Sequence, residues 1–166
     1  MKKLLINLLF IYLIISCNNT ENNLNVTIKT KDSEKRHINN AQDQQKAEIT
    51  NTLYLQKKYW NNGDIDGFMK GYWNSEDLIF TSAKHKPAYG WKNTLERYKE
   101  NYPDIYSMGE LKFDIVEVEL ISDTTSNIYG RWELIRMNDH PIGEFWLDLR
   151  KFNNTWLITK DSTISY

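Results

Sequence analysis

The feature that most constrains the fold is a change of hydrophobic period near residue 111. Before this point apolar residues recur at helical spacing, and after it they alternate as they do in strands. The alternating part contains four runs separated by short polar turns, at 111–120, 128–137, 143–152 and 156–164. Because short connections join antiparallel neighbours, the sequence predicts a four-stranded antiparallel meander preceded by helices, which is the α+β class.

The first of these runs changes phase in its middle. Its apolar residues are odd-numbered up to Ile115 and even-numbered from Val116 onward. A shift of one residue is typical of a β-bulge or a strong bend, because side chains alternate between the two faces of a strand. Asn153-Asn154, between the last two runs, is a tight-hairpin signal.

Three helices are expected before the meander. The first, from about residue 42, carries a buried stripe at i, i+4, i+7 and i+11, widened by two further residues: Ile49, Leu53, Gln56 and Trp60, with Leu55 and Tyr59. Gly63 ends it and Asp64 caps a second, short helix. A third runs from Trp91 to Pro103. Between the second and third, 78–82 is typical of a short strand, and 84–90 is either a loop or another strand.

The N-terminus has the pattern of a targeting segment. Two lysines precede an apolar run of 12 residues, Leu4 to Ile15, which is too short to span a membrane stably. The run ends at Ser16-Cys17 and resembles the bacterial lipoprotein box, which implies a signal peptide over 1–16 and lipidation of Cys17. The alternative is an ordinary signal peptide with a chance cysteine. Residue 18 is Asn rather than Asp, which favours the outer membrane of a bacterial cell envelope, facing the periplasm.

The segment 17–41 is polar, with few and scattered apolar residues, and we expect a tether between membrane and domain there. The folded domain is expected over 42–166. The charge is balanced, with 21 Lys and Arg against 22 Asp and Glu, which argues against a nucleic-acid partner. One cysteine excludes an intrachain disulfide, and the three histidines lack ligand spacing, so neither a metal nor another cofactor is expected.

Nearly all of the domain resembles the nuclear transport factor 2-like superfamily, which includes ketosteroid isomerases and SnoaL-like cyclases, and most of all a bacterial branch of unknown function. The resemblance rests on short motifs in a shared order: Trp60-Asn61-Asn62-Gly63-Asp64-Ile65-Asp66-Gly67-Phe68-Met69, Gly71-Tyr72-Trp73, Gly90-Trp91, Met108-Gly109, Gly130-Arg131-Trp132 and Leu149-Arg150-Lys151 with Trp156. It implies a cone-shaped α+β barrel in which a strongly bent sheet wraps the first helix and leaves a pocket at its wide end.

The resemblance also argues against isomerase activity. An isomerase of this superfamily needs a carboxylate base, a tyrosine and a protonated acid. The matching positions hold Gln56, Ser82 and Leu147, so the three groups are missing here. Members of the unknown branch often carry two histidines around an aspartate on the last strand; here Asp161 remains without the histidines.

Six residues are predicted to approach a common ligand pocket: Tyr72, Trp73, His85, Tyr98, Arg131 and Asp161. Aromatic walls with a few polar groups are the usual composition of a small-molecule site. An equally good reading of Asp161 is structural, as a buried ion pair with Arg131. Trp146 is out of phase with its apolar neighbours, so it is expected on the other face of the sheet, where a homodimer could form.

Three functions remain open from the sequence. The first is a non-enzymatic domain of the envelope that binds a small apolar or amphipathic ligand. The second is a SnoaL-like cyclase, lyase or hydrolase using Asp161 with Tyr98 or His85. The third is a dimerisation or protein-interaction module whose pocket is filled by aromatic side chains.

Overall fold

The computed structural model describes residues 18–83 and 85–166, with the side chains of 18–32 and of His85 outside the description. Cys17, the predicted lipidation site, lies outside the described residues. The chain divides into two units, Met1–Asn40 and Ala41–Tyr166. Within the described residues no helix is both long enough and apolar enough to cross a membrane.

Helix α1 spans Asn18–Asn61 and so begins earlier than the sequence predicted. The polar composition of 18–40 argues against packing, and the side chains of residues 33–40 are indeed exposed. Composition does not argue against a helix, however, because 18–61 contains neither glycine nor proline to interrupt one. The segment from residue 18 to 40 is therefore helical in the structure, and its role as a tether stays a prediction.

The last part of α1 presents the predicted stripe to the domain core. The exposed fractions of Ile49, Leu53, Gln56 and Trp60 are 0%, 1%, 2% and 3%. Leu55 is 41% exposed, so it does not widen the stripe as expected. Gly63 lies just after the end of α1 and has a φ of +73°, a left-handed conformation that glycine adopts without strain.

Four short helical segments follow rather than two. The predicted second helix is α2, Ile65–Phe68, continued by a 3-10 turn η1, Met69–Gly71; α3 is Trp91–Asn101. A further turn, α4 (Ile105–Met108), was not predicted. Its signal is a capping box in which the Asp104 carboxylate accepts from the Ser107 backbone N–H at 2.8 Å.

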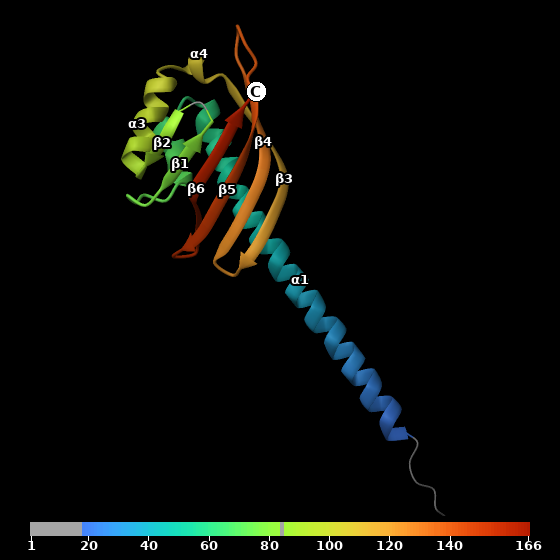
Figure 1. Ribbon diagram of the computed structural model, residues 1–166. Coiled ribbons are helices and arrows are strands. Elements are labelled where there is room, and N and C mark those ends of the chain that lie inside the picture. Colours follow the sequence, from blue (N-terminus) through green and yellow to red (C-terminus); the bar gives the residue numbers. More distant parts are fainter. Residues whose placement is uncertain (1–17, 84) are drawn as a thin grey trace, which may run out of the picture. The chain divides into compact units, whose positions relative to one another are not determined.

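One six-stranded sheet carries the rest of the domain, in the order β2-β1-β6-β5-β4-β3 (Figure 1). The strands are β1 (Ile79–Ser82), β2 (His85–Tyr89), β3 (Glu110–Ser122), β4 (Thr125–Ile135), β5 (Ile142–Phe152) and β6 (Thr155–Ser165). Strands β3 to β6 form the predicted antiparallel meander. The sheet is open rather than a closed barrel, and β1 joins it by pairing parallel to β6, a pairing that the local sequence pattern does not reveal.

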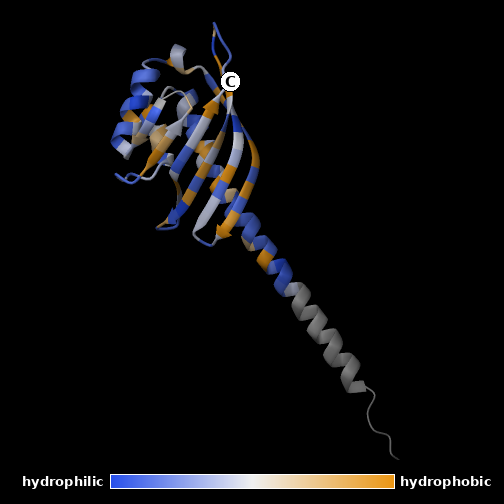
Figure 2. Cartoon of the chain, viewed as in Figure 1, coloured by the Kyte–Doolittle hydropathy of each residue, from blue (hydrophilic) through white to orange (hydrophobic). Residues whose placement is uncertain are grey.

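The phase change in β3 is a bulge, as predicted. The register to β4 shifts between Ile115 and Glu117, which leaves Val116 as the extra residue. The other turn signal is also confirmed, since Asn153 and Asn154 have φ values of 46° and 67°. Figure 2 shows hydrophobic and hydrophilic residues alternating along these strands, so one face of the sheet packs on the core and the other is solvated.

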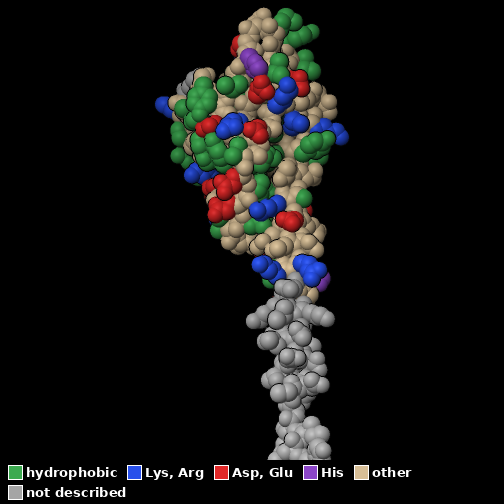
Figure 3. All heavy atoms as spheres, turned by 90° about the vertical axis from the view of Figure 1, so that its right-hand side faces the viewer, with side chains coloured by type: hydrophobic (Ala, Val, Ile, Leu, Met, Phe, Trp, Pro, Cys, Tyr) green, Lys and Arg blue, Asp and Glu red, His purple; other side chains and the backbone are tan. Residues whose placement is uncertain are grey.

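The outer face of the sheet holds two residues of interest from the sequence. Trp146 is 44% exposed and stacks on Tyr129 with 5.2 Å between ring centres. Arg131 shares this face and pairs with Asp114 at 3.3 Å, with both side chains largely exposed. Figure 3 shows that, on one face of the molecule, charged side chains of both signs alternate with hydrophobic ones.

Candidate functional site

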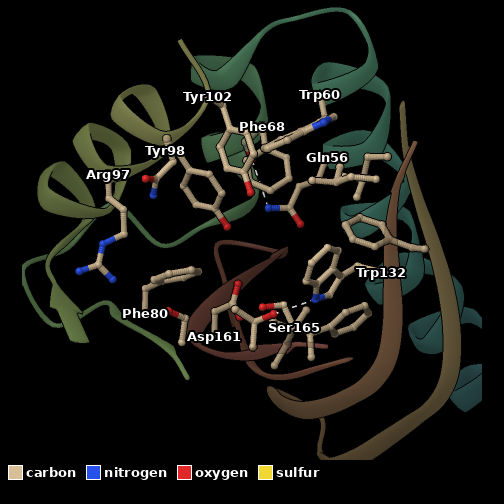
Figure 4. Close-up of a pocket in the computed structure, with 18 of the residues that line it drawn as sticks. Gln56, Trp60, Phe68, Phe80, Arg97, Tyr98, Tyr102, Trp132, Asp161 and Ser165 are labelled. Carbon is tan, nitrogen blue, oxygen red and sulfur yellow. Dashed lines mark hydrogen bonds between the residues drawn. The ribbon is translucent and has the colours of Figure 1, made fainter. Parts of the chain in front are cut away.

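A cavity of about 340 Å³ lies between the concave face of the sheet and the helices of the Ala41–Tyr166 unit. Its volume is at the small end of the range for ligand pockets. Figure 4 shows aromatic rings from both the helices and the sheet surrounding the open space. These rings are Trp60, Phe68, Tyr72, Phe80, Tyr98, Tyr102, Phe113, Trp132 and Phe145.

A chain of three polar side chains lies in this aromatic cavity. The Tyr72 hydroxyl donates to Asp161 Oδ2 at 2.7 Å and lies 3.1 Å from the Tyr98 hydroxyl. Since a hydroxyl has one proton and Tyr72 gives its proton to the carboxylate, Tyr98 is the donor in the second bond when Asp161 is ionised. Figure 4 shows the Asp161 carboxyl and the hydroxyl end of Tyr98 directed toward each other.

Two contacts to the backbone around η1 explain how segments far apart in sequence bring these groups together. Tyr72 follows η1 and forms a parallel bridge with Ile158 of β6, three residues before Asp161. The indole N–H of Trp91, at the start of α3, donates to the Met69 carbonyl of η1 at 3.0 Å. The η1 turn is thus tied both to the strand that carries Asp161 and to the helix that carries Tyr98.

The Asp161 carboxyl has lost most contact with water. The residue is 5% exposed, and on the sheet its neighbours in register are Phe80 and Leu147. Its Oδ1 atom is buried and has no hydrogen-bond partner in the described part of the chain. This burial raises the pKa of Asp161 from 3.8 to about 7, although the bond from Tyr72 acts in the opposite direction.

The two tyrosines respond to the same surroundings. Burial, and then the nearby Asp161 carboxylate, raise the pKa of both the Tyr72 and the Tyr98 hydroxyls well above the ordinary value. Both phenols therefore remain protonated at neutral pH and serve as hydrogen-bond donors. The proton that changes near neutral pH belongs to Asp161.

Three of the six predicted site residues meet in the cavity, namely Tyr72, Tyr98 and Asp161. Trp73 does not reach it and stacks instead on Phe152 with 5.1 Å between ring centres. The reason is local: Tyr72 has an extended backbone, with φ −96° and ψ 148°, so adjacent side chains point in opposite directions.

Arg131 is not brought to the cavity either. It alternates with Trp132, which faces the cavity, so Arg131 faces outward to Asp114. The expected Asp161–Arg131 ion pair is therefore not formed. The backbone of His85 lies in β2, and its side chain is outside the description.

Sequence reasoning missed much of the aromatic wall. Trp132 donates its indole N–H to Thr163 Oγ1 at 2.9 Å and lies over Gly143, where an added Cβ would come within 2.6 Å of the ring. The alternation of side chains along β4 indicates that Arg131 and Trp132 face opposite sides of the sheet, so only one of them can reach the cavity. The sequence predicts Trp60 only as part of the buried stripe of the first helix, and its place on a cavity wall depends on how tightly the sheet curves.

The three positions aligned with isomerase groups all line the cavity. Gln56 is buried and donates its amide to the Phe68 carbonyl at 3.2 Å. The Ser82 hydroxyl is buried without a partner among the described residues, and Leu147 offers no polar group. In the part of the chain that the structure describes, no three His, Cys, Asp or Glu side chains are grouped as a metal site would require.

Comparison with solved structures identifies several similar chains. A nuclear transport factor 2-like protein of unknown function from Shewanella oneidensis is 42% identical, over 72% of this chain and 98% of that one, with a TM-score of 0.69. A ketosteroid isomerase-like protein from Erwinia carotovora is 16% identical, over 72% and 94%, with a TM-score of 0.60. A domain of unknown function with a cystatin-like fold from Nostoc punctiforme is 14% identical, over 72% and 75%, with a TM-score of 0.62. No protein-family model and no curated protein matches the sequence.

The raised pKa of Asp161 predicts how stability depends on pH. Between about pH 4 and 7 the folded chain holds a proton on Asp161 that the unfolded chain has lost. The contribution of this proton to the free energy of unfolding is therefore complete below pH 4 and is lost as pH rises through 7. Asp161→Asn cannot ionise and still accepts from Tyr72. From pH 5 to pH 8 we expect the free energy of unfolding to shift in favour of this variant, relative to wild type, by about 3 kcal/mol. Urea unfolding at each pH measures it.

The matched control is Asp114→Asn, which removes an exposed carboxylate that pairs with Arg131. Its free energy of unfolding should follow the wild-type pH profile, with an offset below about 1 kcal/mol. A constant difference between Asp161→Asn and wild type across the pH range would contradict the prediction.

Proposed function

The chain belongs to the nuclear transport factor 2-like family, and from this premise we propose that its domain binds a small apolar or amphipathic ligand in the cavity without catalysis. The observation that carries the proposal is the Asp161–Tyr72–Tyr98 group inside an aromatic cavity of about 340 Å³. A cavity that served packing alone would gain stability from an apolar residue in place of Asp161, because burying a carboxyl group whose Oδ1 atom has no partner among the described residues is costly.

The shape of the cavity favours ligand binding over a purely structural domain. The third function considered, an interaction module, would be supported by a pocket filled with Trp and Tyr rings, yet these rings surround open volume. A homodimer through the outer face of the sheet is compatible with ligand binding. The half-exposed Trp146 stacked on Tyr129 would suit such an interface.

The location proposed for this domain is the bacterial cell envelope. The support is the apolar run that ends at Cys17, the single cysteine of the chain. Lipidation there would hold the domain at a membrane, and Asn18 favours the outer membrane, with the domain facing the periplasm.

A second candidate, catalysis by Asp161 with Tyr98, is favoured by one observation. A carboxyl group with a pKa of about 7 is matched to proton transfer near neutral pH. Lyases and cyclases that form an enolate need a base of this kind close to a hydrogen-bond donor. Tyr98 would be that donor once its hydroxyl turns from Tyr72 to the substrate. This base would stand on β6 rather than at the isomerase position of Ser82.

Ligand binding is tested with an uncharged hydrophobic dye. N-phenyl-1-naphthylamine, whose fluorescence rises in apolar surroundings, should bind wild type with one saturable site. Ala83 lines the cavity in the exposed β1–β2 turn, so Ala83→Trp should reduce the affinity by at least about tenfold through steric blocking. Thr124→Trp, in the exposed β3–β4 turn, is the control and should bind as wild type does. Equal binding by all three would show that the dye binds elsewhere.

The membrane anchor is tested by Cys17→Ser in bacterial cells. The wild-type protein should be recovered in the membrane fraction and should incorporate labelled palmitate, whereas the variant should do neither, because serine lacks the thiol that is alkylated. A processed variant that remains in the membrane pellet would overturn the assignment.

Catalysis is tested by hydrogen exchange in a simple ketone, which requires no knowledge of the natural substrate. If Asp161 is a base for carbon acids, wild type and Asp114→Asn should accelerate exchange of the α-protons of 2-indanone in deuterium oxide by about a hundredfold over Asp161→Asn. Proton NMR follows the reaction. Equal rates for the three proteins would exclude this second candidate and leave ligand binding in place.

A further inference from the structure

Asp161 differs from the ion-paired carboxylates of the domain in what balances its charge. Several exposed or half-exposed acids lie beside basic side chains, as in the pairs Asp66–Lys99, Asp114–Arg131, Asp139–Arg136 and Glu48–Lys151. Asp161 is buried, and among the described residues no Lys, Arg or His forms an ion pair with it. A buried carboxylate is normally paired with a cation or neutralised by a proton.

The cavity offers what a cation needs besides a carboxylate. Aromatic rings attract ammonium groups through their negative faces, most strongly when water is excluded. Rings from α1, α2, α3, β1 and β4 converge around the space above Asp161: Trp60, Phe68, Tyr98, Phe80 and Trp132 (Figure 4). The Tyr98 hydroxyl donates its proton to Tyr72, and the lone pairs of its oxygen are left to accept a hydrogen bond from the same ligand.

We propose that the cavity selects an organic cation, a protonated amine or quaternary ammonium carried on a small apolar body, with the charged nitrogen beside the Asp161 carboxylate. The inference rests on the proposed ligand-binding function and names the class of ligand. The carboxylate gains a counter-charge that no described side chain gives it through an ion pair, and the aromatic rings enclose the rest of the molecule.

Two arginines also line the cavity, and neither takes the place of this cation. Arg136 is engaged by both carboxylate oxygens of Asp139, at 2.6 and 2.7 Å, and by the Ser107 carbonyl. Arg97 lies over the Phe80 ring at 5.7 Å and donates to the Lys86 carbonyl. Figure 4 shows its guanidinium directed away from Asp161. Among the described side chains that line the cavity, neither arginine is thus paired with Asp161, and a cationic ligand would supply that charge.

The pH dependence of binding separates this ligand class from a neutral one. A cation needs the ionised carboxylate, so its affinity should rise as pH increases through 7, whereas a ligand with a carbonyl group needs the protonated acid and should lose affinity. Among the described residues, the titratable groups that face Asp161 are Tyr72, which follows η1, and Tyr98 from α3, and both stay protonated over this range. From β1 and β5 the neighbours in register are Phe80 and Leu147, which do not titrate.

The experiment compares three probes of similar size and different charge: 2-phenylethylamine, 2-phenylethanol and 3-phenylpropionate. Each displaces N-phenyl-1-naphthylamine from the full protein at pH 6, 7 and 8. At pH 8 the amine should bind at least about tenfold more tightly than the alcohol and the carboxylate. Its affinity should fall several-fold at pH 6, while that of the alcohol should stay nearly constant.

Two variants locate the effect. Asp161→Asn should bind the amine and the alcohol alike at every pH, while Asp114→Asn should keep the wild-type preference, because its carboxylate is on the outer face. If Asp161→Asn does not fold, Tyr72→Phe serves instead. It keeps the carboxylate and removes a bond that lowers its pKa, so the preference for the amine should persist with its pH midpoint shifted upward.

The possible failures are distinct. If the dye binds and the amine displaces it no better than the alcohol at pH 8, the cation proposal is wrong and ligand binding stands. An amine preference that survives in Asp161→Asn also overturns it, because the charge would then be recognised elsewhere. If neither the dye nor any of the three probes binds, the proposed function itself fails.

Discussion

The structure depends on one packing constraint: a meander with a single apolar face must curve around the last turns of α1. The bulge at Val116 lets β3 bend while its apolar residues still face inward on both sides of the bend. One helix is too narrow to fill the concave surface of six strands. The space left over is covered by α2, η1 and α3, which enclose a cavity rather than a solid core.

Once the cavity exists, the acidic residue that lines it stands on β6. In the register of the sheet, the neighbours of Asp161 on β1 and β5 are Phe80 and Leu147, so the sheet itself removes water from the carboxyl. Tyr72 supplies one hydrogen bond and leaves Oδ1 free. An acid that is half compensated in this way has a pKa near neutrality, and its charge responds to whatever enters the cavity.

Periodicity predicted the elements that depend on local sequence, but it did not predict contacts between residues that are far apart in the chain. The α1 stripe, the β3 bulge and the Asn153-Asn154 hairpin follow from spacing and turn chemistry, and the structure has all three. Among the site residues, Tyr72, Tyr98 and Asp161 were placed together through the resemblance. Trp73 and Arg131 do not reach the cavity, because neighbouring side chains in an extended chain point to opposite sides. The parallel pairing of β1 with β6 has no local signal.

Gln56 connects a position matched to an isomerase residue with the polar group in the cavity. Where an isomerase would carry a tyrosine, this side chain donates to the Phe68 carbonyl and packs so closely on Gly71 that a Cβ there would come within 2.6 Å. It therefore fixes η1 against α1, and η1 is the turn that delivers Tyr72 to Asp161. The turn that Gln56 supports thus places a hydrogen-bond donor opposite β6, and the buried acid of the cavity stands on β6 and not at Ser82. The fold supplies the enclosure, and the proposals for what it binds rest on this one buried acid.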